Sequence, residues 1–111
     1  MITSKKGDHS AKPEYTRLQA VRIIKKIAQK GSIRKTGHAK KRMKERNISD
    51  QDILKVLNNG HVYNDPEPHI KTGNWIYTII GSGIDEGDIA IPVFINTKEN
   101  YLLLVTLVRK K

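Results

Sequence analysis

A histidine and two arginines recur at intervals of four residues in the segment GHAKKRMKERNISDQ, residues 37–51. Side chains four positions apart lie on nearly the same face of an α-helix, so His38, Arg42 and Arg46 are expected to form one stripe. Histidine exchanges a proton near neutral pH, and arginine binds phosphate through a planar fork that stays charged. Metal-independent cleavage of RNA needs a base for the ribose 2′-OH, cations around the phosphorus and an acid for the leaving 5′-oxygen. The stripe is compatible with that chemistry, and a structural histidine at the start of a helix is the alternative for His38.

The charge of the chain is strongly asymmetric. Residues 1–60 contain 16 Lys or Arg and 5 Asp or Glu, a balance of +11, whereas residues 61–111 have a balance of −1. Within residues 38–47 the only acid is Glu45, although like charges at helical spacing destabilise a helix. This pattern indicates an anionic partner such as RNA, DNA or an acidic protein, with lysines that only maintain solubility as the alternative. The residues expected to bind RNA are Arg34, Lys35, Lys40, Lys41 and Lys44.

We expect neither a metal nor a cofactor. The chain has no cysteine, which excludes disulfides, thiolate metal sites and a cysteine nucleophile. His61 and His69 lie near Asp65 and Glu67, but their spacing matches no recognised metal site, and a solvated loop is expected there. The turn at residues 81–83 lacks the lysine and the helix of a phosphate-binding loop.

The pattern of apolar residues predicts an α+β fold, with two or three N-terminal helices packed on one face of a C-terminal antiparallel β-sheet. Residues 1–12 are expected to form a flexible basic arm, and residues 13–111 a single domain. Helices are expected from Pro13 to Gly31, over residues 38–47, and from Ser49 to Asn59. Strands are expected over residues 74–81, 88–96 and 101–109, with weaker signals at 32–36 and 61–64. Pro92 indicates an edge position or a bulge, and Met43 is expected to be buried.

The run HAKKRMKERNISDQDILKVLNNG, residues 38–60, resembles the signature of a bacterial family catalogued as domain of unknown function 4258. Its members open with His-Ala, Arg-Met and a second Arg on one helix, followed by a short helix with an acidic cap. Their last strand carries a Val-Thr pair, which LLLVTLVR at residues 102–109 matches. The segment YTRLQAVRIIKKIAQKGSIRKTGHA, residues 15–39, more weakly resembles the start of the motility quorum-sensing regulator toxins of the RelE-like group.

The resemblance implies a RelE-like fold and a toxin that cleaves mRNA without a metal and is neutralised by a cognate antitoxin protein. The helix signature includes His38, Arg42 and Arg46, and Thr106 matches the threonine of the last strand. Arg109 lies near the end of that strand, where related toxins often place a basic residue. Tyr77 is a candidate from its position in a central strand. The expected catalytic residues are therefore His38, Arg42, Arg46, Tyr77, Thr106 and Arg109.

Two other classes of function remain open. Residues 38–58 resemble a helix-turn-helix DNA-binding module, but the second helix begins with acids and is otherwise mostly apolar, which is unlike a recognition helix. An antitoxin or adaptor that binds an acidic partner is the other alternative. The sequence contains no apolar run long enough to cross a membrane, and its basic N-terminus is not followed by the apolar run of a secretory signal. We therefore expect a cytosolic protein without a membrane partner, and self-association stays open.

Overall fold

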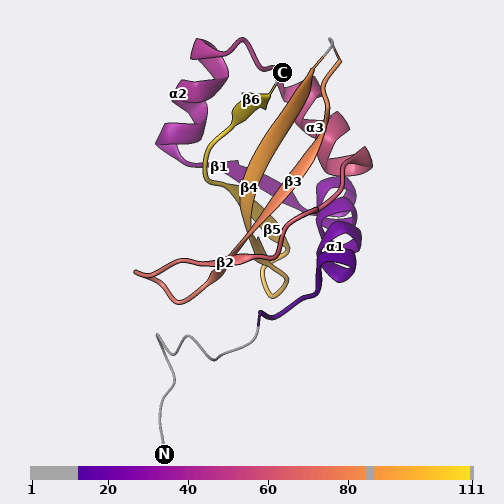
Figure 1. The fold of residues 1–111 in the computed structure, drawn as a ribbon, viewed down its shortest axis with the longest axis vertical. Helices are drawn as coiled ribbons and strands as arrows, with labels where there is room; N and C mark the ends of the chain where they lie inside the picture. The colour runs from indigo at the N-terminus through magenta and orange to yellow at the C-terminus, as the bar shows by residue number, and fades with distance from the viewer. Residues whose placement is uncertain (1–12, 85–86, 111) are drawn as a thin grey trace, which may run out of the picture.

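The computed structural model describes residues 13–84 and 87–110, so the arm predicted at residues 1–12 lies outside the described residues. The chain has the predicted α+β arrangement (Figure 1). The helices are α1 (Arg17–Lys30), α2 (Gly37–Glu45) and α3 (Asp50–Asn59). The strands are β1 (Ser32–Lys35), β2 (Glu67–Pro68), β3 (Trp75–Ser82), β4 (Asp88–Asn96), β5 (Tyr101–Leu104) and β6 (Val108–Lys110).

The strands form one mixed sheet in the order β1-β5-β4-β3-β2, and β6 pairs with β4 beyond the end of β5. Every pairing is antiparallel except the one between β1 and β5, where Ser32 lies opposite Tyr101 and Lys35 opposite Leu104 in parallel. The predicted antiparallel pairing of the C-terminal strands is confirmed, and the strand at residues 32–36, for which no direction was predicted, adds a parallel edge. The reason is physical: β1 pairs with a strand from the far end of the chain, so no local turn determines its direction.

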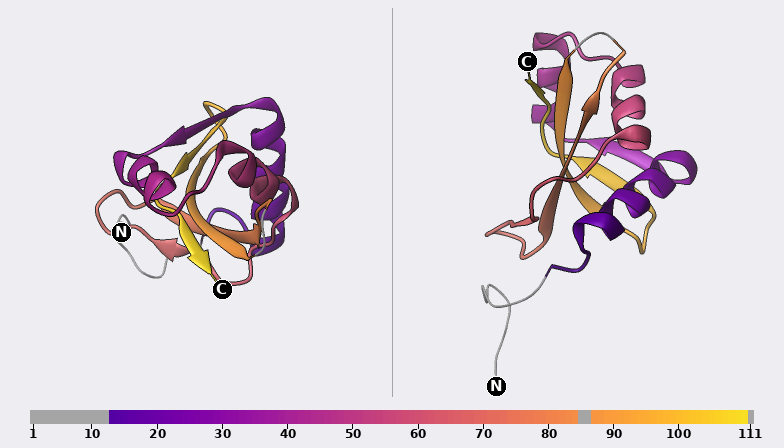
Figure 2. Two further views of the ribbon diagram at one scale, coloured as in Figure 1. Left: turned by 90° about the horizontal axis from the view of Figure 1, so that it is seen from above. Right: turned by 45° about the vertical axis from the view of Figure 1, so that its right-hand side comes forward.

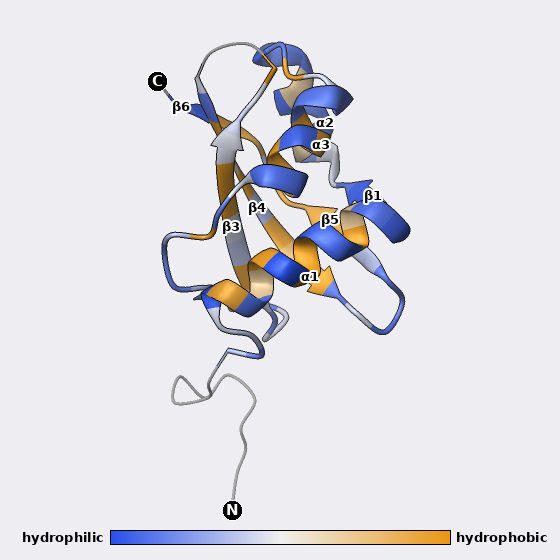
Figure 3. Ribbon diagram, turned by 90° about the vertical axis from the view of Figure 1, so that its right-hand side faces the viewer, coloured by the Kyte–Doolittle hydropathy of each residue, from blue (hydrophilic) through white to orange (hydrophobic). Residues whose placement is uncertain are grey.

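The hydrophobic core lies between one face of the sheet and the helices α1 and α3. Figure 3 shows the largely apolar strands β4 and β5 behind α1. Apolar side chains recur at helical spacing on α1 and α3, so each helix has one face to bury. The buried helical side chains are Ala20, Ile24, Ile27, Ile53, Val56 and Leu57, and those of the central strands include Tyr77, Ile79, Ile91, Val93, Leu102 and Leu104.

Helix α2 lies apart from this layer. In the right-hand view of Figure 2, α2 is on one side of β3 and β4, while α1 and α3 are on the other. Only Ala39 is buried on α2, and Met43 is half-buried against the core rather than fully buried as predicted. The expectation that all helices share one sheet face was therefore wrong for α2. A short helix with two apolar side chains cannot cover a sheet face, so most of its surface stays in solvent.

Pro92 interrupts the sheet in a defined way. It lies within β4, which is flanked by other strands, so the predicted edge position was wrong. Val93 pairs with Leu104 and Ala90 pairs with Val108, which leaves two residues on β4 opposite three on the other strand. This mismatch is a bulge, as the alternative prediction had it, and it forms where proline has no N–H to donate. The strand predicted at residues 101–109 is consequently split into β5 and β6.

Local signals fixed the helix boundaries well. Thr16 and Ser49 each form a capping box at the start of α1 and α3, and Gly31 caps the end of α1. The strand predicted at residues 61–64 is reduced to a single bridge between His61 and Ile80, and β2 was not predicted. Within residues 13–84 and 87–110, no helix is both long and apolar enough to cross a membrane.

Candidate functional site

The start of α2 is fixed to the end of β5 through Thr36. The Thr36 side chain accepts the N–H of Ala39 at 3.0 Å, which caps the helix, and its hydroxyl donates to the carbonyl of Val105 at 2.8 Å. The Thr36 N–H also donates to the carbonyl of Leu104 at 3.1 Å. A side chain at this position supplies one of the bonds that the first turn of a helix lacks. These three bonds position the first turn of α2, which contains His38.

The end of α2 is held by two arginines that were predicted to be catalytic. Arg46 caps the helix and donates through Nη1 to the carbonyl of Leu107 at 2.6 Å. Arg109 donates through Nε to the carbonyl of Arg46 at 3.2 Å and through Nη2 to the carbonyl of Asn47 at 3.1 Å. Asn47 has a positive φ of 54°, which turns the chain out of the helix. The Arg109 guanidinium therefore binds main-chain oxygens at the C-terminal end of α2, and the Arg46 guanidinium binds a main-chain oxygen of the segment between β5 and β6. Cations at the C-terminal end of a helix also complement the helix dipole.

His38 and Arg42 are in direct contact, as their spacing predicts. Arg42 Nε donates to His38 Nε2 at 3.4 Å, and Arg42 Nη1 donates to a carboxylate oxygen of Glu45. Because Nε2 accepts in this contact, the neutral ring carries its proton on Nδ1. His38 is exposed and Arg42 is half-buried. The pair thus combines a proton-exchanging group and a phosphate-binding group at the surface, with Glu45 as the acid that neutralises Arg42.

Lysines surround this pair on α2. Lys40, Lys41 and Lys44 are exposed, and Lys41 lies 4.0 Å from the carboxylate of Glu45. We call Lys40, Lys41, Arg42 and Lys44, together with His38, the α2 basic face. Of the other predicted RNA-binding residues, Lys35 forms an ion pair with Asp50 at 2.7 Å, and Arg34 stacks on the ring of Tyr101 at 3.8 Å. Both residues belong to β1, the strand that directly precedes α2 and its basic face.

Thr106 lies next to α2, whereas Tyr77 does not. Thr106 is half-buried between Val105 and Leu107, whose carbonyls bind Thr36 and Arg46. It is therefore near the basic face, and its role in orienting a catalytic group stays a prediction. Tyr77 is 2% exposed on β3, and its hydroxyl accepts the N–H of Tyr15 at 3.0 Å. Burial raises the pKa of Tyr77 above its ordinary value although the hydrogen bond from the Tyr15 N–H opposes the shift, so the phenol stays neutral.

Asp52 is a buried carboxylate whose importance the sequence indicated only as a helix cap. It accepts the Ser49 N–H at 2.9 Å and the Ile84 N–H at 2.7 Å, and is 6% exposed. The Ser49 bond lowers the pKa of this carboxyl, burial opposes it, and the Ile84 bond and the charge of Arg109 lower it further. Asp52 thus stays ionised and joins α3 to the segment after β3. Its partner Ile84 is distant in sequence, which no local pattern could have revealed.

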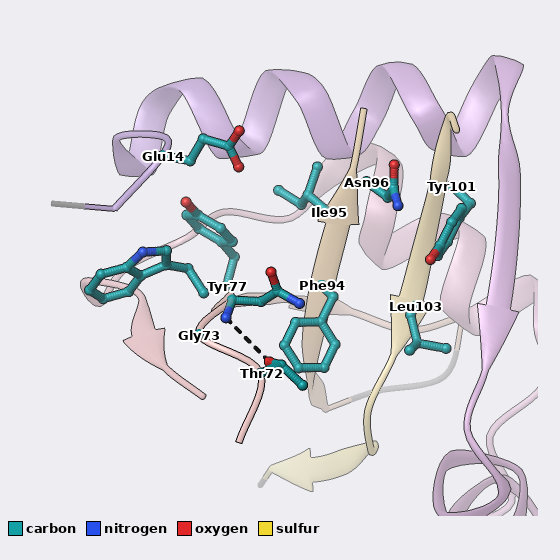
Figure 4. A pocket seen from close by; sticks show the side chains of 11 residues that line it. Glu14, Thr72, Gly73, Tyr77, Phe94, Ile95, Asn96, Tyr101 and Leu103 are labelled. Carbon is teal, nitrogen blue, oxygen red and sulfur yellow. Dashed lines mark hydrogen bonds between the residues drawn. The ribbon is translucent and has the colours of Figure 1, made fainter. Parts of the chain in front are cut away.

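An aromatic pocket of about 480 Å³ is lined by the start of β3, the end of β4 and residues of β5 (Figure 4). Tyr77 points into it, together with Phe94, Tyr101 and Leu103 from the neighbouring strands. The alternation of side chains along a strand places only two of the lining residues, Trp75 and Tyr77, on one face of β3. The pocket was missed because its walls come from four separate segments.

No group of three or more His, Cys, Asp or Glu side chains is placed to hold a metal ion in the parts of the chain that the structure describes.

The comparisons with known proteins identify a family but no characterised relative. Neither the curated proteins nor the solved structures gave a match. The family model described as domain of unknown function (DUF4258) matches residues 36–109. That range begins at the cap of α2 and ends at Arg109, so it contains the α2 basic face and the arginine that holds the end of the helix. The chain belongs to the DUF4258 family.

Proposed function

We propose that this protein is a metal-independent endoribonuclease that cleaves single-stranded RNA by attack of the ribose 2′-OH. The observation that carries the proposal is the contact between Arg42 Nε and His38 Nε2 at 3.4 Å on an exposed helix rich in lysine. A guanidinium binds a phosphate of RNA through two charge-assisted hydrogen bonds, so phosphate is a stronger partner than an imidazole nitrogen, which accepts one. Binding of the scissile phosphate by Arg42 would release His38 Nε2, whose lone pair then accepts the 2′-OH proton.

The reaction leaves a 2′,3′-cyclic phosphate and a 5′-hydroxyl. His38 takes the 2′-OH proton as the 2′-oxygen bonds to phosphorus, the bond from phosphorus to the 5′-oxygen breaks, and the leaving 5′-oxygen takes a proton from water. Arg42 stabilises the charge that develops on the phosphate oxygens. Thr106 lies in the bulge beside α2, and its hydroxyl orients the His38 or the Arg42 side chain by a hydrogen bond. Arg46 and Arg109 bind carbonyl oxygens at 2.6 and 3.2 Å, so we assign them a positioning role that also raises the positive potential. A direct role at the phosphate would require them to leave these carbonyls.

In the same proposal the protein is a cytoplasmic, RelE-like toxin that acts on mRNA and is neutralised by a cognate antitoxin. The support is the resemblance of the helix signature and of the Val-Thr pair at residues 105–106 to that group.

A helix-turn-helix role is less well supported. The recognition helix would be α3. Its residues Ile53, Val56 and Leu57 are buried in the core, and its first turn carries Asp50 and Asp52. Few side chains on α3 are therefore free to read base edges.

The test is an RNA-cleavage assay with purified protein in EDTA. We expect a 2′,3′-cyclic phosphate product, and no cleavage when the 2′-OH at the cut site is replaced by hydrogen. His38→Ala should abolish cleavage with an unchanged melting temperature, because His38 is exposed. The matched control is His61→Ala, which removes another exposed histidine away from α2. Cleavage of the 2′-deoxy substrate at the normal rate would refute the mechanism, since its nucleophile would be missing.

A further inference from the structure

The aromatic pocket has the size and walls of a ligand-binding site. Its volume of about 480 Å³ falls within the range of roughly 300–1,000 Å³ typical of small-molecule sites. The chain has only six aromatic residues of the types Phe, Trp and Tyr, and four of them line this pocket. These are Trp75, Tyr77, Phe94 and Tyr101. Such a concentration of rings at one place provides flat apolar surfaces for a planar ligand.

The pocket also contains polar groups that suit the edge of a heteroaromatic ring. Glu14 contributes a carboxylate, which accepts hydrogen bonds (Figure 4). The hydroxyl of Tyr77 accepts the Tyr15 N–H and has its own proton to donate. Asn96 accepts the Glu99 N–H at 2.8 Å, and its amide group carries two N–H donors. Acceptors and donors therefore stand among apolar walls, which matches a nucleobase better than a purely apolar ligand.

One wall of the pocket is held in place without a ligand. The turn from His69 to Asn74 is closed by bonds from the His69 N–H to the Asn74 carbonyl at 2.7 Å and from the Gly73 N–H to the His69 carbonyl at 2.8 Å. Gly73 has a φ of +76°, a conformation that few other residues adopt. The His69 ring also packs edge-on against Phe94, with centroids 5.3 Å apart. A pocket that is already formed avoids much of the cost of ordering its walls on binding.

A cation stacks on one of the aromatic side chains that line the pocket. The Arg34 guanidinium is 3.8 Å from the centroid of the Tyr101 ring. Tyr101 begins β5, and Leu104 at the other end of β5 accepts the N–H of Thr36, the cap of α2. Three residues of extended strand span about 10 Å. Arg34 therefore lies along a path between the pocket and His38, where a nucleic-acid backbone would need a positive charge.

We propose that the aromatic pocket binds a nucleobase of single-stranded RNA, at a nucleotide that flanks the cleaved bond. This inference rests on the proposed function and deepens it by assigning where the substrate is recognised. The base stacks on the rings of the pocket, its polar edge meets Glu14 and Asn96, and its phosphate lies near Arg34. Stacking on aromatic side chains tolerates every base, so the site supplies affinity and position along the strand.

The experiment uses the emission of Trp75, the only tryptophan in the chain. The probe is a short 2′-O-methyl oligoribonucleotide, which cannot be cleaved by 2′-OH attack. We expect it to quench Trp75, whereas an abasic oligonucleotide with the same phosphates should bind without quenching. Tyr101→Leu and Phe94→Leu should weaken binding roughly 10- to 100-fold, because each removes a stacking surface. Tyr101→Phe keeps the ring and should bind normally, as should Tyr63→Leu, which alters an exposed tyrosine outside the pocket.

The outcomes separate this inference from the proposed function. Fluorescence anisotropy could show that the oligonucleotide binds while Trp75 emission is unchanged and Tyr101→Leu binds with the same affinity. The pocket assignment would then be wrong, and the proposed nuclease function would stand. If a nucleoside monophosphate binds as tightly as the oligonucleotide, the ligand is a free nucleotide and the RNA assignment is overturned. Base-dependent quenching in a protein that cleaves no RNA would support the pocket and refute the nuclease. If neither the oligonucleotide nor the nucleoside monophosphate binds, both the pocket assignment and the proposed function are overturned.

Discussion

Arg42 is the side chain for which His38, Glu45 and a bound phosphate would compete. We predict that Arg42→Ala lowers the single-turnover cleavage rate about 100- to 1,000-fold, the usual effect of removing one charge-stabilising donor. Arg42→Lys should recover only part of that rate, since lysine keeps the charge but lacks the fork. Lys44→Ala is the control, because Lys44 is an exposed cation of the same helix. Equal losses for Arg42→Ala and Lys44→Ala would assign Arg42 to general electrostatic attraction.

Asp52 allows a second prediction at the scale of one residue. Its folded-state pKa is lowered, chiefly by the Ser49 N–H, so its contribution to stability is present above the unfolded-state pKa and is lost as the pH falls through the folded-state pKa. Asp52→Asn should therefore reduce the free energy of unfolding at pH 7 by about 2 kcal/mol, the scale of a hydrogen bond to a charged group. The reduction should shrink in acid, where Asp52 itself becomes neutral.

Urea denaturation at neutral and acidic pH measures this difference. Asp50→Asn is the matched control, because Asp50 is 71% exposed in its ion pair with Lys35 and surface pairs contribute little. A pH-independent difference between the native protein and Asp52→Asn would show that the charge of Asp52 is not what stabilises the fold.

Helices were easier to predict from the sequence than strands, and the reason is the range of the interactions that define them. Thr16, Ser49 and Gly31 cap their helices through partners within four residues, so local pattern suffices. The parallel pairing of β1 with β5 and the bulge opposite Pro92 depend on contacts between distant segments. The candidate site divides in the same way. The contact between His38 and Arg42 follows from helical spacing, whereas the attachment of Arg109 to Asn47 and the aromatic pocket require the folded sheet.

The orientation of α2 gives a prediction at the scale of an element. Met43 is half-buried against the core and Lys44 is exposed, so Met43→Asp should lower the free energy of unfolding by about 1–3 kcal/mol, because a charge enters an apolar contact. Lys44→Asp should change it by less than about 0.5 kcal/mol, as exposed substitutions usually do. Thermal or urea denaturation of both variants provides the measurement. Equal shifts would mean that α2 packs with a different side against β1.

At the scale of the whole molecule, positive charge lies on two separate faces. The α2 basic face includes Lys40, Lys41 and Lys44, and α1 carries Arg22, Lys25 and Lys26 in exposed positions on the other side of the sheet. A polyanion attracted only by net charge would use both faces. A substrate that is cleaved at His38 must contact the first face preferentially, and this difference can be measured through the ions that binding releases.

Replacing Lys40, Lys41 and Lys44 together by alanine should weaken the binding of single-stranded RNA and lower the slope of log K against log salt by about 2, since each phosphate contact contributes roughly 0.7. The Arg22, Lys25 and Lys26 triple alanine variant is the matched control, because it removes the same charge from the other side of the sheet. Its slope should stay close to that of the native protein. Fluorescence anisotropy with an uncleavable oligonucleotide over a range of salt concentrations provides both slopes. Equal reductions of the slope in the two variants would show that net charge alone attracts RNA and that the α2 basic face is not the binding surface.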